Sequence, residues 1–525
     1  MRTIEARPGG ARNHARWLGA ALAALVLAGG CEETPPQEPG VLPPGFLLGA
    51  SVAGFQVDMG CPTLSATECE DPRSDWYVWV TDASLIAERQ LYLSGDPPSS
   101  GPGHWELYDE DFRLAQEEVG LNAFRTSIEW SRVFPTSTVG LEAAEELRAV
   151  ASPAALAHYR AMLEALRDRG LAPLVTLNHY TLPTWMHDAA GCHWDLESCS
   201  PRGWLDREVI VHEIAKYAGF VAAEYGDLVD RWATLNEPFA VVLSGYGQPG
   251  ADRSNPPGVT FAYTELKAVA AAMIEGHARM VDAVRAADVV DADGDGRATD
   301  VGLVFALVPV HPGNASVPLD QEAAVNVEYL YNWSFLDAVT LGDVDEDLDG
   351  VAEHRAELAG RLDWLGINYY SSMWVEGTES PAAPELSPLS TFDLFTMDIR
   401  WDHPAGIRDA IRLAGDRYPG VPLYITENGT AEVDDPDVPS RYLVEHLTWV
   451  SQAIAEGYDV RGYFYWSFMD NYEWNHGMDM RFGLYAVDPA DPQKRRQARP
   501  LVQTYARITA AGRIPSDLLE QYPID

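Results

Sequence analysis

Residues 422–428, with the sequence Pro-Leu-Tyr-Ile-Thr-Glu-Asn, form a short apolar run that ends in a carboxylate and an amide. A continuous apolar run of this length, without alternation of polar and apolar side chains, is typical of a strand buried on both faces. Seven further runs of the same kind occur along the chain, at residues 46–55, 123–128, 172–178, 231–236, 301–309, 362–370 and 460–468.

Helical patterns lie between these runs. Leu156, Tyr159 and Leu163 recur at intervals of three and four residues, which places them on one face of a helix, and residues 210–221 and 443–454 show similar stripes. Eight units of a strand followed by a helix, with no change of composition along them, predict a single α/β domain, a (β/α)8 TIM barrel with loop insertions. A doubly wound open sheet is the alternative, but no glycine-rich phosphate loop follows any of the runs.

The composition excludes several classes of protein. The 525 residues are 46% hydrophobic and 22% charged, which is ordinary for a globular protein and unlike a disordered or collagen-like chain. The formal net charge of −42 repels nucleic acid and anionic membrane surfaces, so neither is expected as a partner.

The N-terminus carries an export pattern. Four arginines precede a short apolar stretch that ends in small residues before Cys31, and this pattern resembles a bacterial lipoprotein signal. Residues 1–30 are therefore expected to be a lipoprotein-like signal peptide, with Cys31 as the lipidated residue. A plain secretory signal is the alternative, which would make the protein periplasmic or secreted rather than membrane-anchored.

The remaining boundaries follow from composition. Residues 31–44 are rich in proline and glutamate and are expected to form an extended tether. The barrel domain is expected over residues 45–515, followed by a short C-terminal tail at 516–525.

Four cysteines remain after the signal, namely Cys61, Cys69, Cys192 and Cys199. An exported chain with an even number of cysteines favours disulfides, and the local pairing would join Cys61 to Cys69 and Cys192 to Cys199. Free thiols are an alternative. A zinc site is another, but neither pair has the spacing of a zinc motif.

In a barrel of this kind the chemistry lies where the strands end. Seven of the eight predicted strands end in groups that hydrogen-bond or titrate: Gln56, Arg125, Asn178-His179, Asn236-Glu237, Asn368-Tyr369-Tyr370, Glu427-Asn428 and Trp466. A capped strand end would explain any one of them, but not seven on one rim.

Two of these groups, Glu237 and Glu427, are carboxylates at the ends of the fourth and seventh predicted strands. A pair of opposed carboxylates suits cleavage of a glycosidic bond, because one can protonate the leaving oxygen while the other attacks the anomeric carbon. A zinc site at His179 is the rival interpretation, but no second histidine lies at metal-binding spacing.

The surrounding motifs resemble those of glycoside hydrolase family 1, the β-glucosidase family. TLNEP (234–238) and ITENG (425–429) resemble the family's acid/base and nucleophile motifs, and the resemblance covers residues 45–510. Further matching stretches are FLLGASVAGFQVD (46–58), FRTSIEWSRVFP (124–135), LNHYTLP (177–183), LDWLGINYY (362–370), YWSFMDNYEW (465–474) and RFGLYAVD (481–488).

The resemblance implies a retaining β-glycosidase in which Glu237 is the general acid/base and Glu427 is the nucleophile. It also implies that Arg125 and Tyr370 hydrogen-bond Glu427 and keep it ionised. The sugar-binding residues that it implies are Gln56, His179, Asn236, Trp466, Glu473 and Trp474.

This sequence departs from the family pattern at two positions. Asp58 stands where the family usually has glutamate, and Tyr180 stands where tryptophan or phenylalanine often follows the histidine. Neither is expected to touch the chemistry. No cation is expected beside Glu473 and Trp474, which argues against a 6-phosphosugar substrate.

The expected activity is hydrolysis of terminal non-reducing β-D-glucosyl residues, or of their galactosyl or fucosyl counterparts, in small glycosides or oligosaccharides. Catalysis is expected to need no cofactor, and the only membrane contact expected is the lipid anchor. A transglycosylase that uses the same covalent intermediate is one alternative. A non-catalytic sugar-binding surface protein is another, but it predicts loss of one glutamate, and both are present.

Two acidic segments resemble the opening of a calcium-binding loop, with aspartates at alternate positions followed by glycine. They contain Asp291, Asp293 and Asp295, and Asp345, Asp347 and Asp349. Both precede a strand, so a structural calcium ion there would lie on the amino-terminal face of the barrel and serve stability. Solvated acidic loops are the alternative, because neither segment has the glutamate that closes such a loop.

Overall fold

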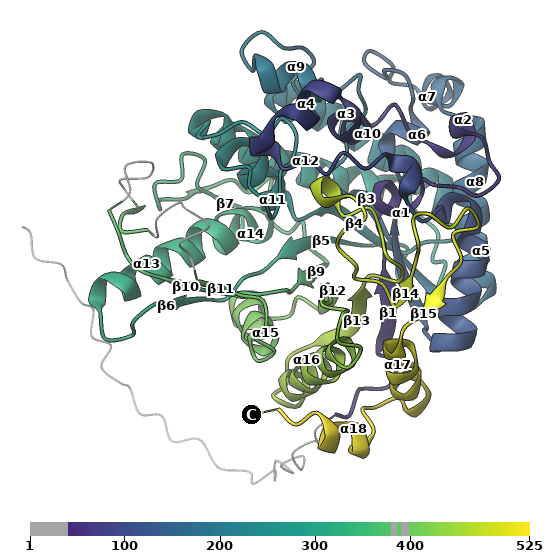
Figure 1. The fold of residues 1–525 in the computed structure, drawn as a ribbon. Helices are drawn as coiled ribbons and strands as arrows, with labels where there is room; N and C mark the ends of the chain where they lie inside the picture. Colours follow the sequence, from purple (N-terminus) through teal and green to yellow (C-terminus); the bar gives the residue numbers. More distant parts are fainter. Residues whose placement is uncertain (1–39, 380–385, 390–397, 525) are drawn as a thin grey trace, which may run out of the picture. The chain divides into compact units, whose positions relative to one another are not determined.

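The computed structural model of the protein describes residues 40–379, 386–389 and 398–524. The predicted signal peptide, Cys31 and residues 31–39 of the predicted tether lie outside the described residues. Eight parallel strands form a closed barrel (Figure 1): β1 (Leu47–Ser51), β2 (Ala123–Ser127), β3 (Ala172–Asn178), β4 (Arg231–Asn236), β5 (Asp300–Ala306), β9 (Trp364–Asn368), β12 (Leu423–Asn428) and β13 (Val460–Trp466).

The barrel closes because β1 pairs with β2 on one side and with β13 on the other, both in parallel. The neighbour order is β1-β13-β12-β9-β5-β4-β3-β2, which is the order of the sequence. Each predicted apolar run coincides with one barrel strand, although β5 begins one residue before its run. The predicted (β/α)8 barrel is therefore confirmed, with strands that are shorter than most of the runs.

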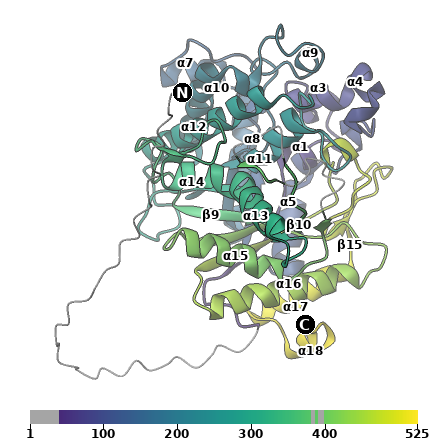
Figure 2. The ribbon, with the colours of Figure 1, turned by 90° about the vertical axis from the view of Figure 1, so that its left-hand side faces the viewer.

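Helices surround this barrel, and the two views place α10 and α12 together on one side and α15, α16 and α17 on another (Figures 1 and 2). The longer helices are α5 (His104–Leu114), α8 (Pro153–Asp168), α10 (Arg207–Tyr225), α12 (Tyr263–Ala287), α13 (Pro318–Glu328), α14 (Ser334–Thr340), α15 (Gly406–Arg417), α16 (Val438–Ala455) and α17 (Pro500–Ala511). The predicted helical stripes lie in α8, α10 and α16, and their apolar residues are buried except Ile454, which is partly buried.

Shorter elements are inserted between the strands and the outer helices. The helices include α1 (Gly54–Val57), α2 (Ala66–Cys69), α3 (Asp75–Thr81), α6 (Trp130–Val133), α9 (Ala189–Trp194), α11 (Pro238–Val242), η5 (Leu243–Gly247), η6 (Tyr329–Trp333) and η8 (Trp474–His476). The small strands are β6 (Val310–Pro312), β10 (Ser372–Val375) and β11 (Asp398–Arg400) in one sheet, β7 (Asp343–Val344) with β8 (Glu353–His354), and β14 (Tyr485–Ala486) with β15 (Gln497–Ala498).

A layer of apolar side chains fills the interior of the barrel. It consists of Ala123, Leu174, Ala233, Val304, Trp364, Tyr424 and Phe464, one from each of seven strands. Since side chains alternate along a strand, the residues two positions further on face the same interior. Arg125 and Trp466 follow Ala123 and Phe464 in this way, so the apolar layer supports a polar layer at the carboxyl ends of the strands.

Strands β4 and β12 change register just before their terminal polar residues. The pairing of β4 with β5 shifts between Ala233 and Asn236, and the pairing of β12 with β9 shifts between Ile425 and Glu427. A shift of this kind turns a side chain that strict alternation would place outside towards the interior. The local irregularity of these two strands therefore contributes to aiming Asn236 and Glu427 into the barrel.

Glycine at position 366 makes room for this polar layer. A Cβ atom at Gly366 would lie 2.8 Å from the Thr426 side chain and 2.9 Å from the Val304 side chain, too close for any side chain. The next inward residue on β9 is Asn368, whose amide oxygen accepts a hydrogen bond from the Thr426 hydroxyl at 2.7 Å.

The two ends of the described barrel domain meet. The Ile514 amide donates to the Gly40 carbonyl at 2.9 Å, and Val41 forms an antiparallel bridge with Arg513. The predicted tail contains the helix α18 (Ser516–Gln521), in which Leu518 is buried. Among the described residues, no helix combines the length and the apolar composition needed to cross a bilayer.

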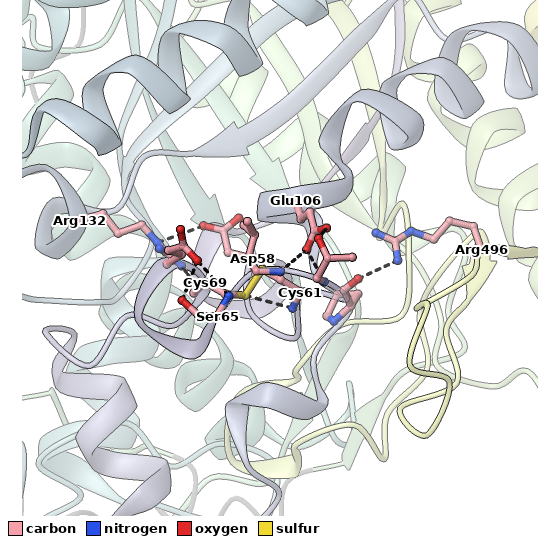
Figure 3. The surroundings of a disulfide bond; sticks show 11 residues. Asp58, Cys61, Ser65, Cys69, Glu106, Arg132 and Arg496 are labelled. Carbon is pink, nitrogen blue, oxygen red and sulfur yellow. Dashed lines mark hydrogen bonds and ion pairs between the residues drawn. A yellow bond between two sulfur atoms is a disulfide. The ribbon is translucent and has the colours of Figure 1, made fainter.

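Both local disulfides are present, Cys61–Cys69 and Cys192–Cys199. Figure 3 shows the first of them, with Asp58 and Arg132 beside it. The loop that it closes is also held from outside, because the Glu106 carboxylate accepts from the Thr63 amide at 2.9 Å and Arg132 donates to the Cys69 carbonyl at 2.7 Å. The bridges lie in the connections that follow β1 and β3, on the carboxyl side of the barrel.

We predict that peptide mapping without reduction recovers these two pairs and no free thiol among the four cysteines. Closing loops this short stabilises the folded state by up to about 2.5 kcal/mol per bridge in the chain-entropy account. Replacing Cys61 and Cys69 together with serine should therefore lower the free energy of unfolding by no more than that amount. Four free thiols in the purified protein would contradict the pairing and also argue against export.

Candidate active site

The polar residues at the strand ends form one connected cluster at the carboxyl end of the barrel. Glu427 is the penultimate residue of β12 and is 4% exposed. Its Oε1 accepts from Arg125 Nη1 at 2.5 Å, and its Oε2 accepts from the Tyr370 hydroxyl at 2.9 Å. Burial raises the pKa of Glu427, the Arg125 guanidinium opposes that rise, and the nearby Glu237 carboxylate adds to it.

Glu237 follows β4 and is 8% exposed. Its φ of 43° lies in the left-handed region, which is strained for a side chain of this size, and Pro238 then begins α11. Asn368 Nδ2 donates to its Oε1 at 2.7 Å, and the Tyr180 hydroxyl donates to its Oε2. Each oxygen of this carboxylate therefore has its own donor.

Asn236 connects the two glutamates. Its Oδ1 accepts from Arg125 Nη2 at 2.7 Å and from Asn368 Nδ2 at 3.2 Å. A chain of hydrogen bonds therefore runs from Glu427 through Arg125, Asn236 and Asn368 to Glu237. Since each link depends on its neighbours, this chain fixes the relative position of the two carboxylates.

His179 lies beside Asn236, with 3.2 Å between its Nε2 and the Asn236 Nδ2. Burial, together with the Arg125 and Arg253 cations, lowers the pKa of His179 well below its usual value, so the ring is neutral. A neutral ring that accepts at Nε2 carries its proton on Nδ1. This Nδ1 is buried and has no hydrogen-bond partner among the described residues.

Glu473 and Gln56 form a second part of the cluster. Gln56 Nε2 donates to Glu473 Oε2 at 2.9 Å, while Gln56 Oε1 is buried without a partner in the described part of the chain. Arg253 Nη2 lies 3.3 Å from Glu473 Oε1. Burial raises the pKa of Glu473 to about 6, against the opposing effects of Arg253 and Gln56.

Aromatic rings border the cluster. The His179 ring is nearly parallel to both Trp466 and Trp474, at an interplanar angle of 17° and centroid distances of 6.0 and 5.8 Å. Trp466 ends β13, and Trp474 begins η8. Flat apolar surfaces beside hydrogen-bonding groups are the combination that binds the two kinds of surface on a pyranose ring.

Residues 38–513 match the sequence model of the family described as glycosyl hydrolase family 1. The chain belongs to glycosyl hydrolase family 1. It is a retaining β-glycosidase of the O-glycoside hydrolase class.

Relatives within family 1 cover nearly the whole chain. A β-galactosidase of Sulfolobus acidocaldarius is 37% identical over 91% of this chain and 96% of its own. The crystal structure of a hyperthermophilic β-glucosidase from Pyrococcus furiosus matches with a TM-score of 0.77 at 31% identity, over 92% of this chain and 98% of that one. A rice β-glucosidase mutant in a covalent complex with Glc has a TM-score of 0.70 at 26% identity, over 89% of this chain and 98% of its own.

The structure brings all of the predicted catalytic and sugar-binding residues of this family 1 enzyme to one rim of the barrel. They are Gln56, Arg125, His179, Asn236, Glu237, Tyr370, Glu427, Trp466, Glu473 and Trp474.

Two expectations about this rim were wrong. Tyr180 was not expected to contact the predicted catalytic residues, yet its hydroxyl donates a hydrogen bond to Glu237. No cation was expected beside Glu473, yet Arg253 is paired with it. Arg253 lies between η5 and α12, in a segment rich in glycine and proline without a family motif, so only the folded connection brings it to the rim. Asp58 is paired with Arg132, at 3.5 Å.

The acidic segments lie before β5 and β9 in the chain. The first is on the amino-terminal side of the barrel as predicted, since it groups with Asp230, directly before β4. The prediction is wrong for the second segment, which lines a cavity with Phe239, two residues after Glu237, and contacts Lys267 near the start of α12. Asp345, Asp347 and Asp349 place ligand oxygens within 4.8 Å of one another. In the other segment the equivalent group consists of Asp230, Asp291 and Asp293, so Asp230 takes the place expected for Asp295. Asp293 is also paired with Arg231 at 3.0 Å. Proximity alone does not establish a cation site, because exposed acidic groups of this kind are common without an ion.

We predict that Tyr370→Phe moves the acidic limb of the kcat/KM profile to higher pH. The Tyr370 hydroxyl stabilises ionised Glu427, so its removal should raise the pKa of that carboxyl further, by roughly one unit. At the pH optimum, kcat/KM should fall about tenfold. The control is Tyr369→Phe, because that hydroxyl donates to the His403 carbonyl instead. An acidic limb that is unchanged in Tyr370→Phe would refute the electrostatic role of the phenol.

Proposed function

We propose that Glu427 is the nucleophile and Glu237 the general acid/base of a double displacement at the anomeric carbon of a β-glycoside. The observation that carries this proposal is the difference between the hydrogen-bond partners of the two carboxylates. Glu427 has a cation and a phenol beside it, which favour the ionised form that can attack. Within the described part of the chain, the hydrogen-bond partners of the Glu237 side chain are a phenol and an amide and include no cation.

In the first step, the Glu427 carboxylate forms a bond to the anomeric carbon while the bond from that carbon to the leaving oxygen breaks. Glu237 gives its proton to the leaving oxygen. In the second step, Glu237 takes a proton from water, the water oxygen bonds to the anomeric carbon, and Glu427 leaves. Two inversions give net retention at the anomeric carbon.

The sugar is proposed to be held by the buried groups that surround this pair. Asn236 would donate to the 2-hydroxyl, a contact that strengthens in the oxocarbenium-like transition state. His179 Nδ1 and Gln56 Oε1 lack partners in the described protein and would bond to sugar hydroxyls. Trp466 would pack against the apolar face of the ring.

The proposed substrate is a terminal non-reducing β-D-glucosyl or β-D-galactosyl residue of a small glycoside or oligosaccharide. The names of the relatives support both sugars, since they include an archaeal β-galactosidase and a β-glucosidase from Oryza sativa. Transfer of the glycosyl group to an alcohol instead of water is the second candidate, because the same intermediate serves both. Product analysis with a competing acceptor distinguishes them.

We also propose that the enzyme is exported, with Cys31 as a lipid attachment site. The N-terminal sequence pattern supports this proposal. The two disulfides are compatible with an oxidising compartment.

The catalytic pair can be tested with two variants. Glu427→Ala should abolish turnover, and added azide or formate should restore part of it by replacing the missing carboxylate. Glu237→Ala should reduce kcat/KM for poor leaving groups far more than for activated aryl glycosides, because a good leaving group needs no proton. Nuclear magnetic resonance of the first product should show the β-anomer.

Two results would contradict the assignment. One is an equal loss of kcat/KM in Glu237→Ala for both classes of substrate. The other is an initial α-anomer, which would indicate carboxyl groups about 6.5–9.5 Å apart instead of the ~5–5.5 Å of a retaining enzyme.

Calcium at the two acidic loops stays a prediction. An ion bound only to the folded protein raises its melting temperature by mass action. Melting the protein in calcium and in EGTA provides the test. Identical melting temperatures in calcium and in EGTA would contradict the prediction.

A further inference from the structure

We propose that Tyr180 is a positioning residue for Glu237, and that its phenol stabilises the negative charge that appears on this carboxylate when the leaving group is protonated. This inference rests on the proposed acid/base role of Glu237. The observation behind it is the hydrogen bond from the Tyr180 hydroxyl to Glu237 Oε2.

The backbone holds Tyr180 in a fixed place. Tyr180 comes two residues after the end of β3, and its φ of 73° is in the left-handed region, where bulky residues are rare. Asn178 Nδ2 donates to the Thr181 carbonyl at 2.8 Å and closes the turn around it. Backbone strain of this kind persists only where the surrounding structure enforces it, and it is found most often at functional sites.

The ring of Tyr180 is enclosed as firmly as its backbone. It is 5% exposed and lies 4.8 Å from the Trp474 ring and 5.2 Å from the His179 ring, measured between centroids. The Arg253 guanidinium lies 5.6 Å from its centre. Contacts from several sides leave the phenol little freedom to turn away from Glu237.

The hydroxyl acts as a donor in this pair. Burial and the neighbouring Glu237 carboxylate raise the pKa of Tyr180 well above its usual value, so the phenol keeps its proton throughout the working pH range. A phenol donates more strongly to an ionised carboxylate than to a neutral acid. The bond therefore stabilises ionised Glu237 relative to its protonated form.

This preference affects the two chemical steps in opposite directions. In the first step, the proton moves from Glu237 to the leaving oxygen as the glycosidic bond breaks, so charge appears on Glu237 and the Tyr180 bond strengthens. An interaction that strengthens in the transition state accelerates the step. In the second step, Glu237 accepts a proton from water and loses charge, so the same bond opposes protonation. Tyr180 therefore favours formation of the glycosyl-enzyme over its hydrolysis.

The test is Tyr180→Phe, which keeps the ring and removes only the hydroxyl. With phenyl β-glucoside, a poor leaving group, kcat/KM should fall roughly ten- to a hundredfold, the usual value of a hydrogen bond to a charged group. With 2,4-dinitrophenyl β-glucoside, kcat/KM should change less than about threefold, because this leaving group needs no proton. Where hydrolysis of the intermediate limits kcat, the variant should be as fast as the parent enzyme or faster.

The matched control is Tyr225→Phe. Tyr225 is buried like Tyr180, and its hydroxyl donates to the Leu156 carbonyl at 3.0 Å, away from both glutamates. This variant should lose stability without any change in the ratio of the two substrates. A merely structural role for the Tyr180 hydroxyl would give the same pattern in both variants.

The outcomes separate this inference from the proposed function. An equal loss on both substrates in Tyr180→Phe, or no loss on either, overturns the role of Tyr180. If Glu237→Ala discriminates between the substrates and Tyr180→Phe does not, only the Tyr180 inference fails. If Glu237→Ala does not discriminate either, the acid/base assignment itself fails.

Discussion

The buried ion pair between Arg125 and Glu427 is the interaction on which the rest of the site depends. Both side chains are almost fully buried, at 0% and 5% exposure. A guanidinium offers several donors in one plane, and Arg125 uses them on the Thr176 hydroxyl, Glu427 and Asn236. A buried charge left without its partner costs roughly 3–5 kcal/mol, so neither member of the pair tolerates loss of the other. The arginine thereby fixes Glu427 in place and also orients the amide that leads to Glu237.

The charges of the pocket are balanced only in part. The pocket holds three carboxylates, Glu237, Glu427 and Glu473, beside two arginines, Arg125 and Arg253. Burial raises the pKa of Glu427 and of Glu473, and the excess of negative charge raises it further. Such a site holds protons near neutral pH, which acid/base chemistry requires. Backbone geometry contributes as well, because Tyr180, Glu237 and Trp474 all have positive φ values. Strain at three functional positions indicates that the barrel beneath them is stable enough to enforce it.

Much of this arrangement could be predicted from the sequence. The barrel follows from eight apolar runs, and the glutamates follow from polar residues at strand ends, because both patterns are local. The contacts between connections could not be predicted in the same way. Arg253 carries no motif, and its pairing with Glu473 joins two parts of the chain that are 220 residues apart. The hydrogen bond from Tyr180 to Glu237 depends on a turn with positive φ. Tyrosine rarely adopts such a φ, so its presence in the sequence does not predict the turn. Asp230 entered the acidic group because its position in space, not in the sequence, is close to Asp291.

The meeting of Gly40 and Ile514, at the two ends of the described barrel domain, has a practical consequence. Gly40 and Ile514 are joined by a hydrogen bond beyond the amino ends of the strands, whereas the sugar-binding rim lies at the carboxyl ends. The chain could therefore be joined across these ends and reopened in a surface loop, giving a circular permutant with the same barrel. Attachment of the enzyme to a bead or to a fused domain through the Ile514 end would likewise leave the pocket facing the solution.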